Sequence, residues 1–394
     1  MHLGSSKLGQ SLFFMPGNDD WKRVRSILSP VFTSGKLRAM MGRIGGIADK
    51  LVQILIELEK NGRIGGIADK LVQILIELEK NGKPVDMRNY VGAFTMDVIS
   101  ACGYGIETDS INNPDHPIVI NAKRLLASTS KLPTILSVLT PGLARLFHLE
   151  PFDKQSKRRT DFIQLILDAE NSDKELNSHS DSEPEVDDES VGGVSTIKYN
   201  LTLSPDEMVA QGLTFFTAGY DTTSASITNS LYFLSKHPDC QQILYEELRS
   251  CDEFTYEKLS QLKYLNAVIN ETLRLAPSLT RYQRECLQDY KLGNTGITIP
   301  KGASVEIYPY ALHRDPDFWP NPNDFIPDRF LNPVHHPYAY IPFSSGPRIC
   351  LGQRFVKQEM RMCLAKLITK LEFSMCNQTI LEYLKVVQYC YKHF

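Results

Sequence analysis

One short stretch of the sequence holds the residue types that could bind a metal-centred cofactor. It runs from Phe343 to Gly352 and reads FSSGPRICLG. A lone cysteine is usually a small buried hydrophobe, but here Gly346 allows a tight turn and Gly352 lets a large flat group approach closely. Arg348 lies two residues before Cys350, where it can pair with an anion. A thiolate in a glycine-bounded loop, with an arginine for an acidic group, indicates an axial ligand to haem iron, with the haem carboxylates as the anions.

The residues after this loop strengthen the interpretation. Residues 353–370 are expected to form an amphipathic helix, and the amino end of a helix stabilises a thiolate at Cys350. The pattern Phe-x-x-Gly-x-Arg-x-Cys-x-Gly resembles the haem-binding loop of the cytochrome P-450 family. The resemblance implies a mainly α fold with a small β region, haem b as cofactor, and Cys350 as the iron ligand.

A second element is a long predicted helix. Ser204, Pro205 and Glu207 form a helix start, with serine as the cap, and the helix is expected to run to about Ser235. Its length of roughly 45 Å would cross the whole domain. The middle, residues 217–223, reads TAGYDTT, and glycine and threonine weaken a helix at its centre.

That local weakness has two explanations. Ala218 and Gly219 could leave a shallow dent for dioxygen beside the iron, or the glycine could pack against a neighbouring helix. Thr222 offers a hydroxyl and Asp221 a titratable carboxyl, which together could relay protons from solvent. The stretch resembles the Ala-Gly-x-(Asp/Glu)-Thr-Thr oxygen groove of the same family, in which Asp221 and Thr222 are implied to be catalytic.

Other residues would hold the cofactor and the substrate. Trp21 and Arg25 are four apart and share one helix face, so both can donate to one carboxylate, although an amphipathic surface helix has the same pattern. The resemblance implies that they grip the haem propionates together with Arg284 and Arg348. Residues 26–37 resemble the microsomal drug- and steroid-oxidising, 3A-like branch. The implied substrate-pocket residues are Phe215, Thr217, Ser278, Leu279 and Thr280.

Glu271 and Arg274 lie three apart on one predicted helix. An exposed ion pair at this spacing would contribute little to stability. The resemblance instead joins them with Arg329 in a buried charge network that braces the cysteine loop.

Composition limits the remaining classes. The chain has 394 residues, 42% hydrophobic and 23% charged, as expected for a globular protein, and we predict a single domain over 1–394. A net charge of −3 gives no reason to expect a nucleic-acid partner. The eight cysteines are scattered, which suits a reducing compartment rather than a zinc site or a disulfide framework.

Three segments depart from an ordinary family member. Residues 42–61 are repeated identically at 62–81, which indicates a duplicated coding segment without function, real or an error of sequence assembly, rather than a helical array. Residues 171–200 are rich in Ser, Asp and Glu and are expected to form a flexible acidic loop. Residues 125–159 do not predict the second helix of the family's substrate lid, and residues 160–169 resume the family's pattern.

The ends of the chain and the smaller elements complete the prediction. No signal peptide or run of 18 apolar residues is present, so we expect the amino-terminal anchor of the membrane-bound relatives to be missing. An apolar core helix is expected over 91–103, and short strands over 297–302 and 305–307. After Phe373 the match fades, and residues 379–394 do not suggest the family's substrate-contacting hairpin.

The resemblance implies a haem-thiolate monooxygenase at the cytosolic face of the endoplasmic reticulum membrane. It would insert one oxygen atom into an apolar organic substrate of steroid or xenobiotic type, with electrons from NADPH through a flavoprotein reductase and cytochrome b5 as a second candidate donor. The residues named as docking cations, which could equally be solvated charges, are Lys22, Arg23, Arg354 and Lys357. The alternatives are a haem-thiolate isomerase, a non-catalytic haem-binding protein and a defective fragment; Asp221 and Thr222 argue against the isomerase.

Overall fold

The computed structural model describes residues 10–13, 15–60, 85–113, 120, 203–376 and 379. The chain divides into two compact units, one formed by Met1–Arg43 with Met96–Tyr220 and the other by Ile44–Thr95 with Asp221–Phe394. The second copy of the repeat, the lid region and the acidic loop over 171–200 lie outside the described residues, as do all but one of the residues over 379–394.

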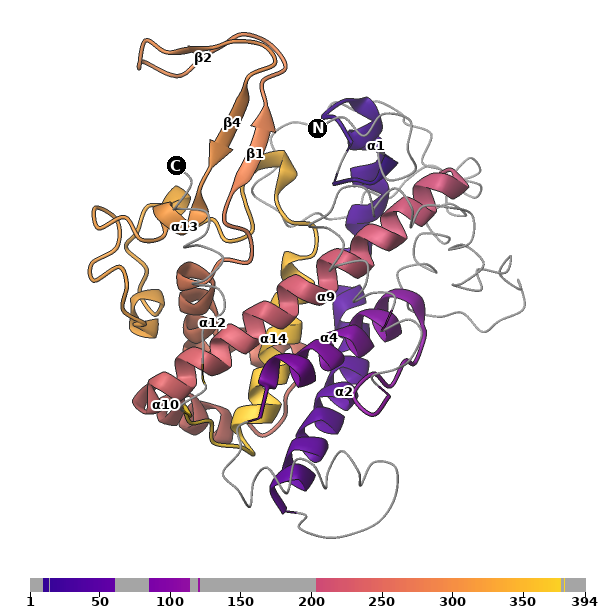
Figure 1. The fold of residues 1–394 in the computed structure, drawn as a ribbon, viewed down its shortest axis with the longest axis vertical. Coiled ribbons are helices and arrows are strands. Elements are labelled where there is room, and N and C mark those ends of the chain that lie inside the picture. The colour runs from indigo at the N-terminus through magenta and orange to yellow at the C-terminus, as the bar shows by residue number, and fades with distance from the viewer. Residues whose placement is uncertain are drawn as a thin grey trace, which may run out of the picture. The chain divides into compact units, whose positions relative to one another are not determined.

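The described part of the chain is mainly helical with two short antiparallel sheets, in line with the predicted fold class (Figure 1). The longer helices are α1 (Asp19–Leu28), α2 (Ser34–Lys60), α4 (Met87–Tyr104), α9 (Pro205–Lys236), α10 (Pro238–Arg249), α12 (Lys263–Leu275) and α14 (Gln353–Ile368). The short helices are η2 (Ser29–Phe32), α11 (Tyr256–Gln261), α13 (Pro309–Leu312), η3 (Pro327–Phe330), η4 (Pro337–Ala339) and η5 (Gly346–Arg348).

The core of the second unit is built on α12 and α14. Apolar residues recur along α12 at Leu265, Val268, Ile269 and Leu273, and all four are buried. The helix packs against α10, α14 and η3, and α14 in turn packs against α10 and α11. The cysteine loop therefore leads directly into a helix that packs in the core of this unit.

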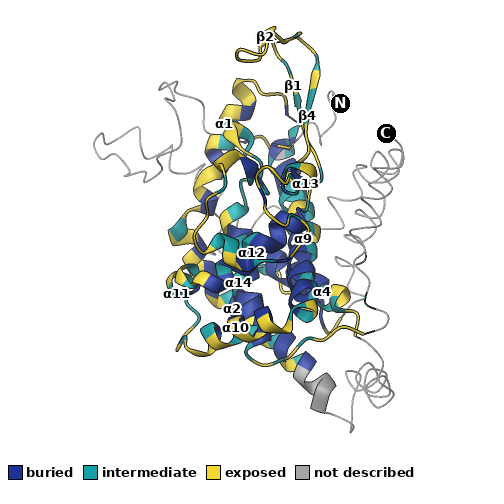
Figure 2. Ribbon diagram, turned by 90° about the vertical axis from the view of Figure 1, so that its left-hand side faces the viewer, coloured by how far each residue is buried: buried dark blue, intermediate teal, exposed yellow. Residues whose placement is uncertain are grey.

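The strands form two separate pairs. β1 (Tyr282–Glu285) pairs with β4 (Ser304–Ile307), and β2 (Tyr290–Lys291) pairs with β3 (Thr298–Ile299). Strands were predicted near β3 and β4, but these two are not paired with each other, since each has a partner that the pattern did not reveal. The β2–β3 hairpin is exposed except at Ile299, which is half-buried (Figure 2).

The start of α9 is the predicted capping box. The Glu207 amide donates to Ser204 Oγ at 3.2 Å, and the Ser204 amide donates to Glu207 Oε2 at 2.8 Å. The helix runs unbroken to Lys236, one residue beyond the predicted end. Residues 215–222 therefore all lie within this one helix, in spite of the glycine and threonines at its centre.

Candidate functional site

The cysteine loop is closed by its own backbone. The Cys350 amide donates to the Phe343 carbonyl at 2.9 Å, and the Ile349 amide donates to the Gly346 carbonyl at 2.9 Å. Gly346 has φ +71°, a conformation that favours glycine, so the predicted tight turn is confirmed. The Cys350 residue is exposed, so that a ligand can reach its side chain.

The helix after the loop also begins as predicted. Gly352 is the residue before α14, which begins at Gln353 and ends at Ile368, two residues before the predicted end. The positive end of the helix dipole therefore lies three residues from Cys350 in sequence. Gly352 has φ −86°, so its backbone does not require glycine, and its predicted contact with a flat cofactor stays a prediction.

An arginine from the neighbouring sheet contacts the cysteine loop. Arg284 Nη2 donates to Ser344 Oγ at 2.8 Å, and its Nη1 donates to the Gln283 carbonyl at 2.9 Å. Ser344 has φ +67°, which is uncommon for a residue other than glycine. This left-handed conformation could not be predicted from the sequence. A guanidinium carries five N–H groups, and these two hydrogen bonds use only part of that set. The side chain can therefore also donate to an anion.

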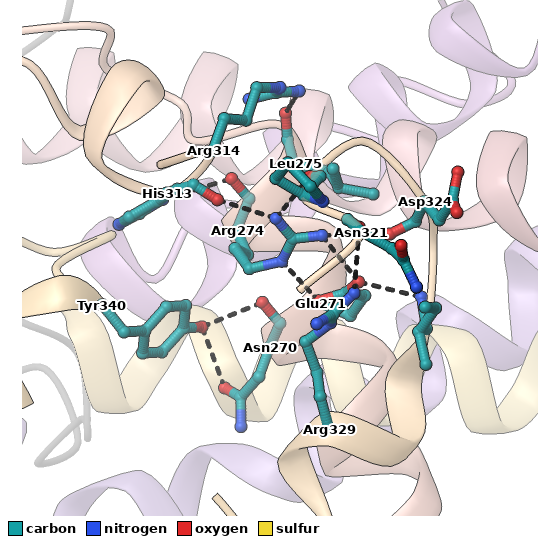
Figure 3. A network of polar contacts seen from close by, with 12 residues as sticks. Asn270, Glu271, Arg274, Leu275, His313, Arg314, Asn321, Asp324, Arg329 and Tyr340 are labelled. Carbon is teal, nitrogen blue, oxygen red and sulfur yellow. Dashed lines mark hydrogen bonds and ion pairs between the residues drawn. The ribbon is translucent and has the colours of Figure 1, made fainter. Parts of the chain in front are cut away.

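The charge network predicted around Glu271 is present and buried (Figure 3). Arg274 donates from Nε to Glu271 Oε2 at 2.7 Å and from Nη2 to Oε1 at 2.9 Å, and both side chains are 0% exposed. Arg329 Nε donates to Glu271 Oε1 at 3.1 Å. The two arginines thus share one carboxylate, in which each oxygen has a donor.

The same network ties α12 to the irregular connector, residues 313–326, between α13 and η3. Arg274 Nη1 donates to the carbonyls of His313 and Pro322, each at 2.7 Å, and Nη2 donates to that of Asp324 at 3.0 Å. The Ile326 amide donates to Glu271 Oε1 at 2.8 Å. Every one of these groups would be costly to leave unsatisfied in the core, so the connector is held in one place.

A buried histidine, not identified by sequence reasoning as a site residue, continues this network. The Ile341 amide donates to His313 Nε2 at 3.0 Å, so the ring proton must lie on Nδ1, which is 3.2 Å from the Arg274 carbonyl. Burial lowers the pKa of His313 to about 3, and the nearby charges of Arg274 and Arg314 act in the same direction. The imidazole is therefore neutral at ordinary pH.

Tyr282, in β1, is a second residue that the sequence did not reveal. Its hydroxyl lies 2.9 Å from the Ile341 carbonyl and 2.7 Å from that of Pro342, and it donates to them through one shared hydrogen. Burial raises the pKa of Tyr282 to about 12. Only its place two residues before Arg284 could have drawn attention to it.

The predicted proton relay lies in the second unit. Asp221 is exposed and Thr222 is half-buried. The Thr222 carbonyl accepts from Ser226 Oγ at 2.8 Å and from Ser278 Oγ at 3.2 Å. Ser278, a predicted pocket residue, is therefore joined to the turn of α9 that carries Thr222, whereas Leu279 is exposed and Thr280 is half-buried.

Gly219 lies close to a neighbouring helix. A Cβ at this position would lie 2.9 Å from Ile99 Cδ1 on α4, closer than real Cβ contacts. This contact supports the alternative interpretation of helix packing, and the predicted place of Gly219 beside dioxygen stays a prediction. Ala218 is exposed, and its predicted place beside the cofactor stays a prediction.

Arg348 lies in η5 of the second unit and is half-buried, whereas the remaining predicted cofactor and pocket residues lie in the first unit. On α1, Trp21 is buried and Arg25 is half-buried, and Asn18 Oδ1 caps the helix by accepting from the Trp21 amide at 3.1 Å. Phe215 packs edge-on against Phe32 at 5.7 Å. Thr217 Oγ1 donates to the Leu213 carbonyl at 2.9 Å. The roles of Trp21, Arg25, Phe215 and Thr217 toward cofactor and substrate stay predictions.

The candidate docking cations differ in their surroundings. Arg23 forms an ion pair with Glu207 in which both side chains are largely buried, and exposed Lys22 pairs with Asp19 at 2.9 Å. Lys357 Nζ lies 5.7 Å from the Phe343 ring centroid, and burial lowers its pKa to about 8. Arg354, on the first turn of α14, is exposed and best placed to meet a partner.

An open pocket of about 500 Å³ lies between α2, α10 and α14. Its lining contains none of the predicted site residues. The candidate site is therefore defined by the contacts around Cys350 rather than by this pocket.

Comparison with known proteins gives a consistent result. A family model described as Cytochrome P450 matches residues 2–384. Cytochrome P450 3A29 of Sus scrofa and Cytochrome P450 3A6 of Oryctolagus cuniculus are each 36% identical over 377 residues, which cover 88% of this chain and 66% of each relative. Cytochrome P450 3A5 of Homo sapiens is 36% identical over 391 residues, which cover 91% of this chain and 69% of the relative.

Proposed function

This chain belongs to the cytochrome P450 family, and we propose that it is a haem-thiolate monooxygenase that inserts one atom of dioxygen into an apolar organic substrate. The observation that carries the proposal is the exposed Cys350, held on a closed glycine turn directly before α14. The chain spans 66% of the length of the first two relatives. The proposal therefore rests on residues that this chain itself contains.

The groups around Cys350 fit an iron porphyrin. A cysteine thiolate is a suitable iron ligand, and the amino end of α14 favours that thiolate. Arg284 contacts this loop from β1, and Arg348 is part of the loop; the guanidinium groups of both would pair with the propionates. Trp21 and Arg25 would add further donors. When bound, the haem supplies oxygen activation, which a thiolate ligand promotes by donating electron density.

Two residues of α9 would move the protons that the reaction consumes. Asp221 is exposed and can exchange a proton with solvent. The Thr222 hydroxyl on the next residue would pass that proton to the oxygen substrate. The bond from Ser278 to the Thr222 carbonyl fixes the backbone that carries this hydroxyl.

The finer assignments are proposals by family membership. The substrate would be of steroid or xenobiotic type and would contact Phe215, Thr217, Ser278, Leu279 and Thr280. Electrons would come from NADPH through a flavoprotein reductase, with exposed Arg354 as a docking cation. We place the protein at the cytosolic face of the endoplasmic reticulum membrane, and among the described residues no helix is long and apolar enough to span a bilayer.

The deciding experiment is the spectrum of the reduced, CO-bound full chain after haem loading. We expect the band characteristic of thiolate ligation. Cys350→Ala should abolish it, whereas Cys376→Ala, which removes another exposed cysteine, should leave it unchanged. A band that survives in Cys350→Ala would show that another group binds the iron.

A second measurement separates the enzyme from a protein that only binds haem or acts as an isomerase. With a flavoprotein reductase and an apolar test substrate, product formation should require both NADPH and dioxygen. A thiolate band without NADPH-dependent product across a panel of steroids and xenobiotics would favour the non-catalytic alternative.

A further inference from the structure

We propose that Tyr282 and His313 are positioning residues for the Cys350 sulfur. Tyr282 bonds to both residues that lead into the cysteine loop, Ile341 and Pro342, and His313 bonds to Ile341 from a different element of the second unit. The inference rests on the proposed function in one respect, since the sulfur they position is the proposed iron ligand.

Hydrogen bonds restrict the movement of residues 340–342, which form the entry to the cysteine loop. The Ile341 amide is bound by His313 Nε2 at 3.0 Å, and the Ile341 carbonyl accepts from Tyr282 Oη at 2.9 Å. The Pro342 carbonyl accepts from the same hydroxyl at 2.7 Å. One residue earlier, the Tyr340 hydroxyl lies 3.1 Å from the Asn270 carbonyl on α12. Three consecutive residues are thus held by side chains from α12, β1 and the connector.

The position of this entry is passed to Cys350 through the backbone. Phe343 follows Pro342 directly, and its carbonyl accepts the Cys350 amide at 2.9 Å. The Ser344 amide also donates to the Ile341 carbonyl at 3.1 Å. A shift of Ile341 and Pro342 would therefore move the acceptor of the Cys350 amide, and the sulfur with it.

His313 also connects the buried charge network to the loop. The imidazole donates to the Arg274 carbonyl, and the Arg274 guanidinium donates to the His313 carbonyl, so the two residues are bonded in both directions. From Glu271 the path runs through Arg274 and His313 to Ile341 without a gap. This gives the network a physical route for bracing the cysteine loop.

The first test uses the haem-free full chain, so that it does not depend on the iron site. Tyr282→Phe removes only the hydroxyl and should speed hydrogen exchange at the Cys350 amide about fivefold, the effect of losing one hydrogen bond. The matched control is Tyr308→Phe, because Tyr308 is an exposed tyrosine directly after β4, whose hydroxyl donates to Glu306. The control should leave exchange at Cys350 unchanged.

The second test follows the thiolate itself. In the haem-loaded, reduced and CO-bound chain, Tyr282→Phe should lose the thiolate band about fivefold faster than wild type, and Tyr308→Phe should match wild type. For His313, Gln can accept the Ile341 amide and donate to the Arg274 carbonyl, whereas Leu can do neither. His313→Gln should therefore keep the band longer than His313→Leu.

Two outcomes would overturn the proposal. One is a Tyr282→Phe chain whose Cys350 exchange and band lifetime equal those of Tyr308→Phe, even if its melting temperature falls. The other is a Tyr282→Phe chain that cannot fold while Tyr308→Phe folds, since the hydroxyl would then support the whole unit. A wild-type chain without a thiolate band would instead refute the proposed function, and the exchange test would still decide the role of Tyr282.

Discussion

Single candidate residues in this protein are held in position by groups that are distant in sequence. The Cys350 amide donates to the Phe343 carbonyl, and residues 341–342 before the loop are bound by His313 and Tyr282. Thr222 has its carbonyl bound by Ser278, which is 56 residues away. At this scale the chemistry of each candidate residue depends on hydrogen bonds that hold its backbone, and these bonds can be tested one at a time.

The hydroxyl of Thr222 should control how efficiently reductant is used. We expect Thr222→Ala to produce more hydrogen peroxide per NADPH consumed, because the proton donor would be missing, with a loss of product formation of about 10²-fold or more. Thr222→Ser keeps a hydroxyl and should recover most of the coupling. Equal peroxide yields in the Ala variant and wild type would remove Thr222 from the relay.

The buried imidazole of His313 should make stability depend on pH. Its folded pKa of about 3 lies below the value of 6.5 for a free histidine, so between these values the unfolded chain binds more protons. The stabilisation is full above pH 6.5 and is lost as the pH falls toward 3. The slope from this group is at most about 1.4 kcal/mol per pH unit.

Urea unfolding at a series of pH values would measure this slope, with His313→Gln as the non-titrating reference. The charged or titratable groups facing the ring are Arg274, Arg314, His335 and Tyr340. Because these four groups are present in both chains, the difference between the two curves is assigned to the His313 imidazole. Parallel curves for wild type and variant would show that the imidazole is not titrating as described.

The sequence predicted those site residues that belong to local patterns. Cys350 and Gly346 lie in one ten-residue stretch, and Glu271 and Arg274 are one helical turn apart. Tyr282, His313 and Ser344 were missed because their importance lies in contacts with distant backbone, which no spacing rule reveals. The role of Gly219 was left open for the same reason, since the packing explanation required the position of Ile99.

Secondary-structure elements followed their local signals more faithfully. The capping box at Ser204 and the amphipathic runs predicted α9, α12 and α14 to within a few residues. The strand partners were not predicted, because β1 and β2 are short and their pairing with β4 and β3 is set by tertiary contacts.

The network that joins α12 to the connector should dominate local stability. Arg274→Met leaves the Glu271 carboxylate buried with fewer donors and should lower the free energy of unfolding by about 3–5 kcal/mol. The matched control is Arg281→Met, because Arg281 pairs with Glu306 at 3.4 Å with a side chain that is 57% exposed. That control should cost less than about 1 kcal/mol. Denaturant titration compares the two, and similar losses would show that burial of the network has no special effect.

The whole molecule raises the question of the identical repeat. The first copy supplies buried residues to α2, among them Ile44, Ala48, Leu51, Val52 and Leu55. Because the copies are identical, deleting either one gives the same chain. A deletion of residues 62–81 therefore keeps the face that α2 buries.

We expect that deletion to leave haem loading unchanged and to alter the free energy of unfolding by less than about 1 kcal/mol, because the remaining copy supplies the same buried residues to α2. Thermal unfolding and haem titration of the two chains would measure both quantities. A deleted chain that loses haem or unfolds at much lower temperature would show that the second copy contributes to the fold, and the duplication would then have a structural role.

The left-handed backbone at Ser344 carries a further consequence for protein engineering. A glycine at this position would adopt φ +67° without penalty and would relieve roughly 1 kcal/mol of conformational strain. The same exchange would release Arg284 from its anchor on the loop and let its guanidinium swing. Ser344→Gly would therefore exchange relief of backbone strain for the loss of the Arg284–Ser344 hydrogen bond, and it would free a guanidinium that we propose pairs with an acidic group of the cofactor.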